Sequence, residues 1–126
     1  MPSDPYRIMV VEDELQFSAS LKHNLEKRGY VVQCAESVEE AIPALDKFMP
    51  HLLVTDGALP GAQGLSLAAF LRQSGKHKGV KVVAMSGDPS QKQLISVMRD
   101  LIHAFLEKPF KAEELVEVIE RLLPPT

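Results

Sequence analysis

Short apolar runs alternate with longer amphipathic segments along the chain, and this alternation restricts the fold more than any other feature. Apolar runs of about four to eight residues are typical of buried parallel strands, and longer periodic segments are typical of helices. Five strands that are each followed by a helix predict an α/β fold, a (βα)5 parallel sheet with helices on both faces. The predicted strands are Arg7–Val11, Tyr30–Cys34, Leu52–Thr55, Lys81–Met85 and Ala104–Leu106, and the predicted helices are Leu15–Arg28, Val38–Phe48, Leu65–Ser74, Pro89–Arg99 and Ala112–Leu123.

Local signals mark several of these boundaries. Gly29 follows two cations and is typical of a helix stop. Ser37 and Glu40 have the spacing of a capping box at the start of the second helix. Pro43 should kink or shorten that helix. Lys111 gives the last helix a weak start, because its side chain offers no capping acceptor.

Length, charge and composition limit the kinds of protein that this chain can be. The chain has 126 residues, which suits one domain, and a net charge of −3, which predicts neither nucleic-acid binding nor a membrane-binding face. Cys34 is the only cysteine and is expected to be a buried thiol in a reducing compartment. No apolar run approaches ~18 residues and the N-terminus lacks a signal-peptide core, so a cytoplasmic location is expected.

Polar residues follow four of the five predicted strands. Glu12 and Asp13 follow the first strand, Asp56 the third, Ser86 the fourth, and Lys108 lies just beyond the fifth. The carboxyl ends of parallel strands share one edge of the sheet, where ligands bind in this class of fold. We therefore expect two or three carboxylates, a hydroxyl and an ammonium group to converge.

This set of groups suits phosphoryl chemistry. Clustered carboxylates repel one another and recruit a cation, and a site with few oxygen donors suits Mg²⁺. A lysine and a hydroxyl can hold phosphoryl oxygens, and a carboxylate that attacks phosphorus forms an acyl phosphate. Asp56, at the end of an apolar strand, is the candidate nucleophile.

From about Tyr6 to Leu123, the chain closely resembles the receiver domain of two-component response regulators. The motifs are Glu12-Asp13, Asp56-Gly-Ala-Leu-Pro60 with Gly64, Ser86-Gly87 and Lys108-Pro109-Phe110. Each motif is weak alone, but together they stand in order on the expected strand ends. The resemblance implies the doubly wound, flavodoxin-like and CheY-like strand order 2-1-3-4-5, with one receiver domain over residues 1–126.

The resemblance also implies roles for individual residues. Asp56 would be the phosphoacceptor. Asp13, assisted by Glu12, would bind Mg²⁺ together with Asp56 and the backbone carbonyl of Ala58. Glu12 stands where an aspartate is more usual, and its longer carboxylate can act through a bound water.

Three further residues match the switching part of the family. Ser86 would be the hydroxyl that moves to the phosphoryl group, Lys108 the lysine that contacts it, and Phe105 the aromatic that moves inward. The Lys108–Pro109 peptide bond would be cis.

The partners implied are a histidine kinase or histidine phosphotransfer protein as donor, and an effector or a second copy as reader. The reading face would be the fourth helix, fifth strand and fifth helix, around Gln91–Asp100 and Lys111–Glu120. Such a domain is not a conventional enzyme, since it catalyses only its own phosphorylation and dephosphorylation. Residues 124–126 are either a plain terminus or the start of a linker.

Other interpretations remain open. The chain could be the receiver of a hybrid histidine kinase, or a docking module whose phosphorylation is incidental. An aspartate-nucleophile phosphatase is disfavoured, because Ala58 stands where its acid would be. A nucleotide-binding module is disfavoured by the acidic first loop, which lacks glycine. The four histidines show no metal-ligand spacing and are expected at the surface or at strand ends; His51 and the pair Leu101-Ile102 depart from the family pattern but should not touch the chemistry.

Overall fold

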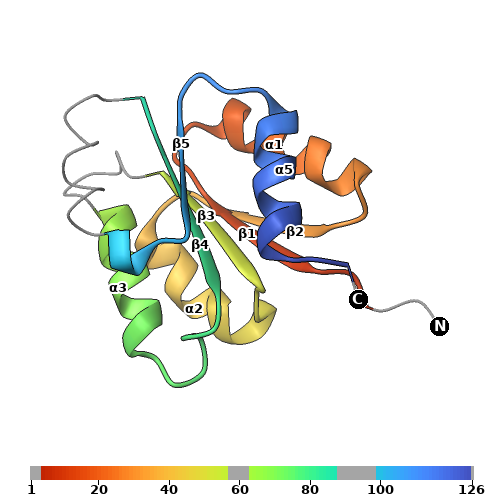
Figure 1. The fold of residues 1–126 in the computed structure, drawn as a ribbon. Helices are drawn as coiled ribbons and strands as arrows, with labels where there is room; N and C mark the ends of the chain where they lie inside the picture. Colours follow the sequence, from red (N-terminus) through yellow and green to blue (C-terminus); the bar gives the residue numbers. More distant parts are fainter. Residues whose placement is uncertain (1–3, 57–62, 88–98, 126) are drawn as a thin grey trace.

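Five parallel strands form a single sheet in the order β2-β1-β3-β4-β5 (Figure 1), as the sequence predicted. The structure is a computed structural model that describes residues 4–56, 63–87 and 99–125. The first strand matches its predicted bounds, and the last three each extend one residue further than predicted. The strands are β1 (Arg7–Val11), β2 (Val31–Ala35), β3 (Leu52–Asp56), β4 (Lys81–Ser86) and β5 (Ala104–Glu107).

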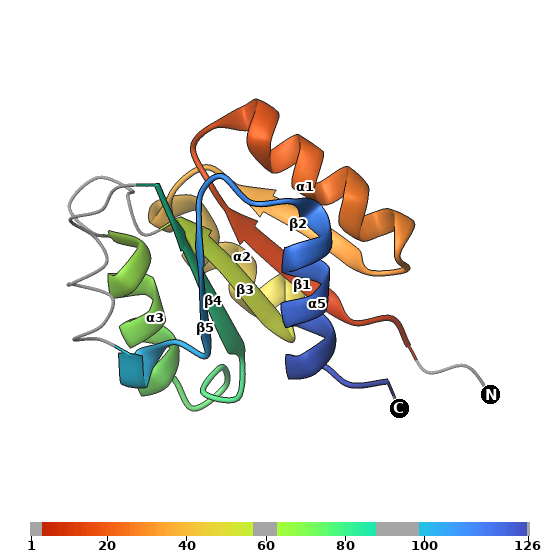
Figure 2. The ribbon, with the colours of Figure 1, turned by 45° about the horizontal axis from the view of Figure 1, so that its top comes forward.

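Helices cover both faces of the sheet, with α1 and α5 on one face and α2 and α3 on the other (Figures 1 and 2). The helix predicted at Pro89–Arg99 lies outside the described residues except for Arg99, which begins a short 3₁₀ helix. None of the described helices is long and apolar enough to cross a membrane. The elements are α1 (Leu15–Lys27), α2 (Val38–Phe48), α3 (Gln63–Gln73), the 3₁₀ helix η2 (Arg99–Leu101) and α5 (Ala112–Leu122).

The core has two layers because alternate strand residues point to opposite faces of the sheet. In β1, Ile8 and Val10 pack toward α1 and α5, whereas Met9 and Val11 pack toward α2 and α3. All four side chains are fully buried. Burial on both faces explains why the strand reads as a continuous apolar run rather than as an alternating one.

Backbone hydrogen bonds at the helix ends account for the boundaries. Gly29 has φ +95°, the left-handed conformation that ends α1, and the amide of Tyr30 still donates to Leu25 of that helix. The prediction that β2 begins at Tyr30 was therefore wrong by one residue, and pairing with β1 starts at Val31. At the start of α2, the hydroxyl of Ser37 accepts from the amide of Glu40, as the capping pattern predicted.

Two other helix-end predictions had mixed outcomes. Pro43 lies within α2 and does not shorten it, since the helix runs over the predicted Val38–Phe48. Lys111 provides no side-chain cap for α5, as expected. The carboxylate of Glu114 compensates by accepting the Lys111 backbone amide at 3.2 Å.

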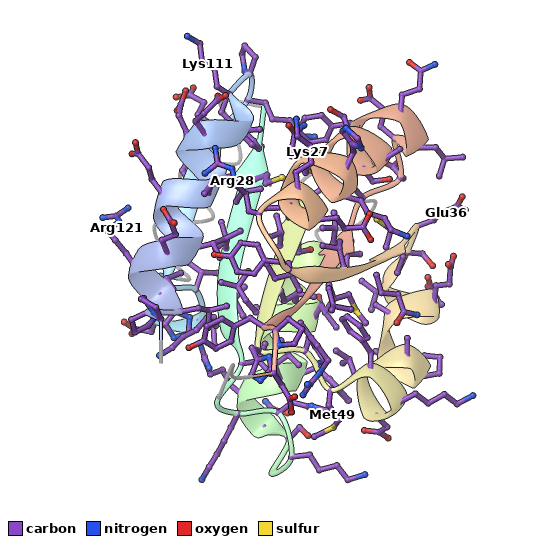
Figure 3. The ribbon with its side chains drawn as sticks, turned by 90° about the vertical axis from the view of Figure 1, so that its right-hand side faces the viewer. Lys27, Arg28, Glu36, Met49, Lys111 and Arg121 are labelled. Atoms are coloured by element: carbon purple, nitrogen blue, oxygen red, sulfur yellow. The ribbon has the colours of Figure 1, made fainter. Side chains whose placement is uncertain are left out.

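The parallel sheet gives the molecule two chemically different edges. We call the edge where the strands end the carboxyl edge, and the edge where they begin the amino edge. In Figure 3, Lys111, which follows β5, lies toward the top of the molecule, and Met49, which precedes β3, lies toward the bottom.

Candidate functional site

Three carboxylates meet at the carboxyl edge. Glu12 and Asp13 directly follow β1, and Asp56 is the last residue of β3. One oxygen from each of the three lies within 4.8 Å of the others, close enough to share one metal ion. Glu12 is 1% exposed and Asp56 is 5% exposed, whereas Asp13 is exposed. Two of the acids are thus held away from water, where their mutual repulsion is weakly screened.

The backbone fixes Glu12 in this position. Its amide donates to the carbonyl of Ala35 at 3.0 Å, which ties it to the end of β2, and its Oε2 accepts from the amide of Glu14 at 3.0 Å. Burial raises the pKa of Glu12, and the charge of Asp56 adds to this, while the hydrogen bonds from Lys108 and Glu14 offset part of the rise.

Lys108 supplies the positive charge between the buried acids. Its backbone amide donates to the carbonyl of Ser86 at 2.9 Å, which holds the end of β5 against the end of β4. Its Nζ donates to Glu12 Oε1 at 2.8 Å and to Asp56 Oδ2 at 3.3 Å. Burial alone would lower the pKa of Lys108, but the two carboxylates outweigh burial, and the pKa is raised. The ammonium group is therefore held in its charged form.

The remaining predicted site residues lie at or near the same edge. Ser86 ends β4, is 1% exposed and stands in register with Glu107 of β5. Phe105 is partly buried in β5, in register with Ala84. The Lys108–Pro109 peptide is cis. Ala58 lies outside the described residues.

Two aromatic side chains lie near Lys108: Phe17, which was not predicted as part of the site, and Phe110, which stood in the Lys108-Pro109-Phe110 motif without a role of its own. Lys108 Nζ lies 4.7 Å from the ring centroid of Phe17, over the ring. Phe17 and Phe110 meet edge to face, with centroids 5.7 Å apart and planes at 78°. Phe17 follows Asp13 by four residues and Phe110 follows Lys108 by two. This closeness in sequence to predicted site residues was the one signal that could have pointed to the two rings. It did not distinguish packing in the core from a contact with the ammonium group.

A family model for the response regulator receiver domain matches residues 8–120 of the chain. The chain belongs to the response regulator receiver domain family. The match covers the sheet except for Arg7, the first residue of β1, and it includes Glu12, Asp13, Asp56 and Lys108 at the carboxyl edge. In this receiver domain Glu12, Asp13, Asp56, Ser86 and Lys108 therefore stand at strand ends or just beyond them, whereas residues 57–60 of the Asp56 motif lie outside the described residues.

Two relatives of the receiver are named as regulatory proteins. The phosphate regulon transcriptional regulatory protein PhoB of Rhizobium meliloti is 29% identical over 117 residues, which are 93% of this chain and 52% of that protein. The nitrogen assimilation regulatory protein NtrX of Azorhizobium caulinodans is 30% identical over 118 residues, 92% of this chain and 26% of that protein. The chain thus spans about half, or less, of these relatives.

A solved structure agrees with the fold. A crystal structure described as a putative response regulator from Chloroflexus aurantiacus superposes with a TM-score of 0.84 at 30% identity, covering 94% of this chain and 98% of that one. The fold is thus shared with a chain of similar length.

The histidines of the receiver met the sequence expectation with one exception. His23 is exposed, and His51 and His103 directly precede strands β3 and β5. His77 was expected at the surface or at a strand end and is instead 2% exposed in the turn before β4, where its Nε2 lies 2.9 Å from Oδ1 of Asp46 in α2. This pair ties α2 to the turn before β4 and is remote from the acidic cluster in sequence and in the fold.

Proposed function

We propose that this receiver is phosphorylated on Asp56 by a histidine kinase or histidine phosphotransfer protein. The observation that carries the proposal is the position of Lys108 Nζ, 3.3 Å from Asp56 Oδ2 and held to Glu12 at 2.8 Å. A positive charge is thereby fixed beside Asp56, an almost wholly buried aspartate at the end of β3. Preorganised charge of this kind stabilises a phosphoryl group as it is transferred.

The bonds that form and break in the transfer step belong to Asp56 and the donor. A carboxylate oxygen of Asp56 attacks phosphorus and forms the O–P bond of an acyl phosphate. The P–N bond of the donor phosphohistidine breaks, and its electron pair stays with the imidazole nitrogen. The imidazole leaves neutral, with its proton on the other ring nitrogen. Lys108 would hold a phosphoryl oxygen as a point charge.

The acidic cluster fits the Mg²⁺ ion that the family uses. Glu12, Asp13 and Asp56 offer hard oxygen donors within 4.8 Å of one another, and few protein ligands suit an ion that keeps several waters. These residues would hold the ion, with the backbone carbonyl of Ala58 as a further ligand. When bound, the ion supplies positive charge against the repulsion between Asp56 and the incoming phosphoryl group.

Phosphorylation would act as a switch by adding charge and acceptor oxygens at the end of the sheet. Ser86 would move toward the phosphoryl group and Phe105 would turn inward, changing the face formed by the fourth helix, β5 and α5. That face, with exposed residues of α5 such as Glu113, Glu117 and Arg121, would meet the effector or a second receiver.

Labelling with a small phosphodonor tests the proposal without knowledge of the kinase. The receiver is incubated with phosphoramidate and Mg²⁺, and the acyl phosphate is followed by intact-protein mass spectrometry. We expect the chain to gain one phosphoryl group, Asp56→Asn to gain none, and Asp4→Asn, an exposed control, to match the unmodified chain. Full labelling of Asp56→Asn would overturn the assignment.

A further inference from the structure

Among the described residues, side chains of two kinds contact the ammonium group of Lys108. Glu12 and Asp56 contact it through hydrogen bonds, and Phe17 lies against it with the face of its ring, 4.7 Å from Nζ to the centroid. The side chain of Lys108 is only 22% exposed. A cation over an aromatic face is attracted by the ring quadrupole, most strongly where water is excluded.

The Phe17 ring is held by its own neighbours. Phe17 lies in the first turn of α1 and Phe110 in the connection from β5 to α5, and both pack against the core layer between the sheet and these helices. Their edge-to-face contact is a preferred geometry for two rings. The ring that faces Lys108 is thus braced from two elements that enter the site from different parts of the chain.

The attraction of the ring differs in kind from that of the two acids. A lysine ammonium group has three N–H donors, and its contacts with Glu12 and Asp56 are hydrogen bonds. The ring face attracts the charge without requiring a directed hydrogen bond. It can therefore continue to hold the ammonium group while N–H donors are reassigned from a carboxylate to a phosphoryl oxygen.

We propose that Phe17, braced by Phe110, is a positioning residue that keeps the ammonium group of Lys108 beside Asp56 for phosphoryl transfer. This inference rests on the proposed role of Asp56. Phe17 acts through Lys108 and needs no contact with the phosphoryl group.

Fluorination of one ring separates this role from simple packing. Mono-, di- and trifluorinated phenylalanine at position 17 keep the shape of the ring while progressively weakening its negative face. We expect the maximal rate of labelling by phosphoramidate to fall stepwise along this series, by about three- to five-fold in total, with little change in the phosphoramidate concentration that gives half the maximal rate. Phe17→Leu should lose a similar factor and Phe17→Tyr should retain most of the rate.

The controls assign each failure to its cause. The same fluorinated residues at Phe70, which is 40% exposed on α3, should leave the rate unchanged. A flat series at position 17, with folding intact by circular dichroism, would overturn the positioning role. An effect seen only with a histidine phosphotransfer protein as donor, and not with phosphoramidate, would also overturn it and would indicate a docking contact. Labelling of Asp56→Asn would instead overturn the proposed function itself.

Discussion

The two edges of the sheet use polar side chains in different ways: the amino edge pairs neutral imidazoles with backbone amides, and the carboxyl edge gathers charged groups. At the amino edge, the backbone amides of Arg7 and Val82 donate to Nδ1 of His51 and of His103, at 2.9 and 3.0 Å. Each histidine returns a backbone bond to the same residue, at 2.8 and 2.7 Å. Both imidazoles therefore continue the strand ladder by one more pair of bonds. A ring nitrogen that accepts an N–H carries no proton, so the arrangement uses neutral imidazole.

The carboxyl edge instead brings ionised side chains against one another. One carboxylate oxygen from each of Glu12, Asp13 and Asp56 lies within 4.8 Å of the other two. The ammonium group of Lys108 donates hydrogen bonds to Glu12 and Asp56. The amino edge satisfies the backbone and stabilises the fold. The carboxyl edge keeps like charges together, which opposes folding and favours a ligand that brings positive charge. Strand ends alone therefore do not make a site; the sign and number of charges there do.

Removal of the Lys108 ammonium group should give the largest effect. Lys108→Met leaves Glu12 and Asp56 buried without their cation, and we expect the free energy of unfolding to fall by about 2 kcal/mol, less than the loss for a fully buried pair because Lys108 is partly exposed. Mg²⁺ should restore part of the loss by replacing the missing charge. Urea unfolding with and without Mg²⁺ measures both effects, and the exposed Lys47→Met is the matched control. An unchanged midpoint would show that Lys108 does not neutralise this edge.

The sequence predicted the carboxyl edge well because topology alone gathers strand ends. An α/β pattern places Glu12, Asp56 and Ser86 on one edge before any side-chain position is known. The same reasoning could not predict that Phe17 faces Lys108, since that contact depends on the path of the chain after β5. Apolar helix positions are expected in a core, and this one also faces a charge.

Errors arose where a neighbouring element changed a local preference. Tyr30 has the composition of a strand residue, but its amide closes the end of α1. His77 has the composition of a surface turn, but α2 covers it and Asp46 binds it across 31 residues of sequence. The partner of Tyr30 belongs to the preceding helix and the partner of His77 is distant in sequence, so the strand or turn propensity of the residue itself holds no information about either.

The imidazole acceptor of the amino edge provides the second test. His51→Leu leaves the amide of Arg7 without its acceptor, and we expect a loss of about 1 kcal/mol in the free energy of unfolding. His51→Asn places an amide oxygen near the position of Nδ1 and should recover most of it. Denaturant unfolding checks the pair, and labelling by phosphoramidate should be unaffected in both. Equal losses in the two variants would mean that ring packing against Tyr6, and not the hydrogen bond, is what matters.

A smaller effect of opposite sign is expected at the carboxyl edge. Asp13 is exposed and its carboxylate adds to the repulsion with Glu12 and Asp56. Asp13→Asn should therefore raise the free energy of unfolding without metal by about 0.5 kcal/mol. The increase in melting temperature on adding Mg²⁺ should be lost in the same variant. Calorimetry with and without the ion measures both, and a destabilised Asp13→Asn would show that the acid makes a favourable contact at this edge.

Lowering the pH should change the stability contributed by the two edges in opposite directions. We expect this effect to be the smallest of those predicted here. Burial, together with the charges of Arg7 beside His51 and of Arg72 and Lys81 beside His103, lowers the pKa of both imidazoles. As the pH falls below about 6.5, these imidazoles take up protons in the unfolded chain before they do so in the folded chain. The stability that they contribute is therefore fully present above that pH and is lost as the pH falls. Glu12 has a raised pKa, so the folded state takes up that proton first and acid favours folding at the carboxyl edge.

The two contributions separate by substitution. Between about pH 7.5 and 5.5 the imidazoles dominate, because their ordinary pKa lies in that range and that of a carboxyl group lies below it. Replacing both His51 and His103 by asparagine should flatten the stability profile there, whereas Glu12→Gln should alter it only at lower pH. Urea midpoints measured across the pH series distinguish the variants. If Glu12→Gln instead flattened the profile near neutral pH, the group that titrates there would lie at the carboxyl edge. That result would contradict the assignment of this pH dependence to the imidazoles of the amino edge.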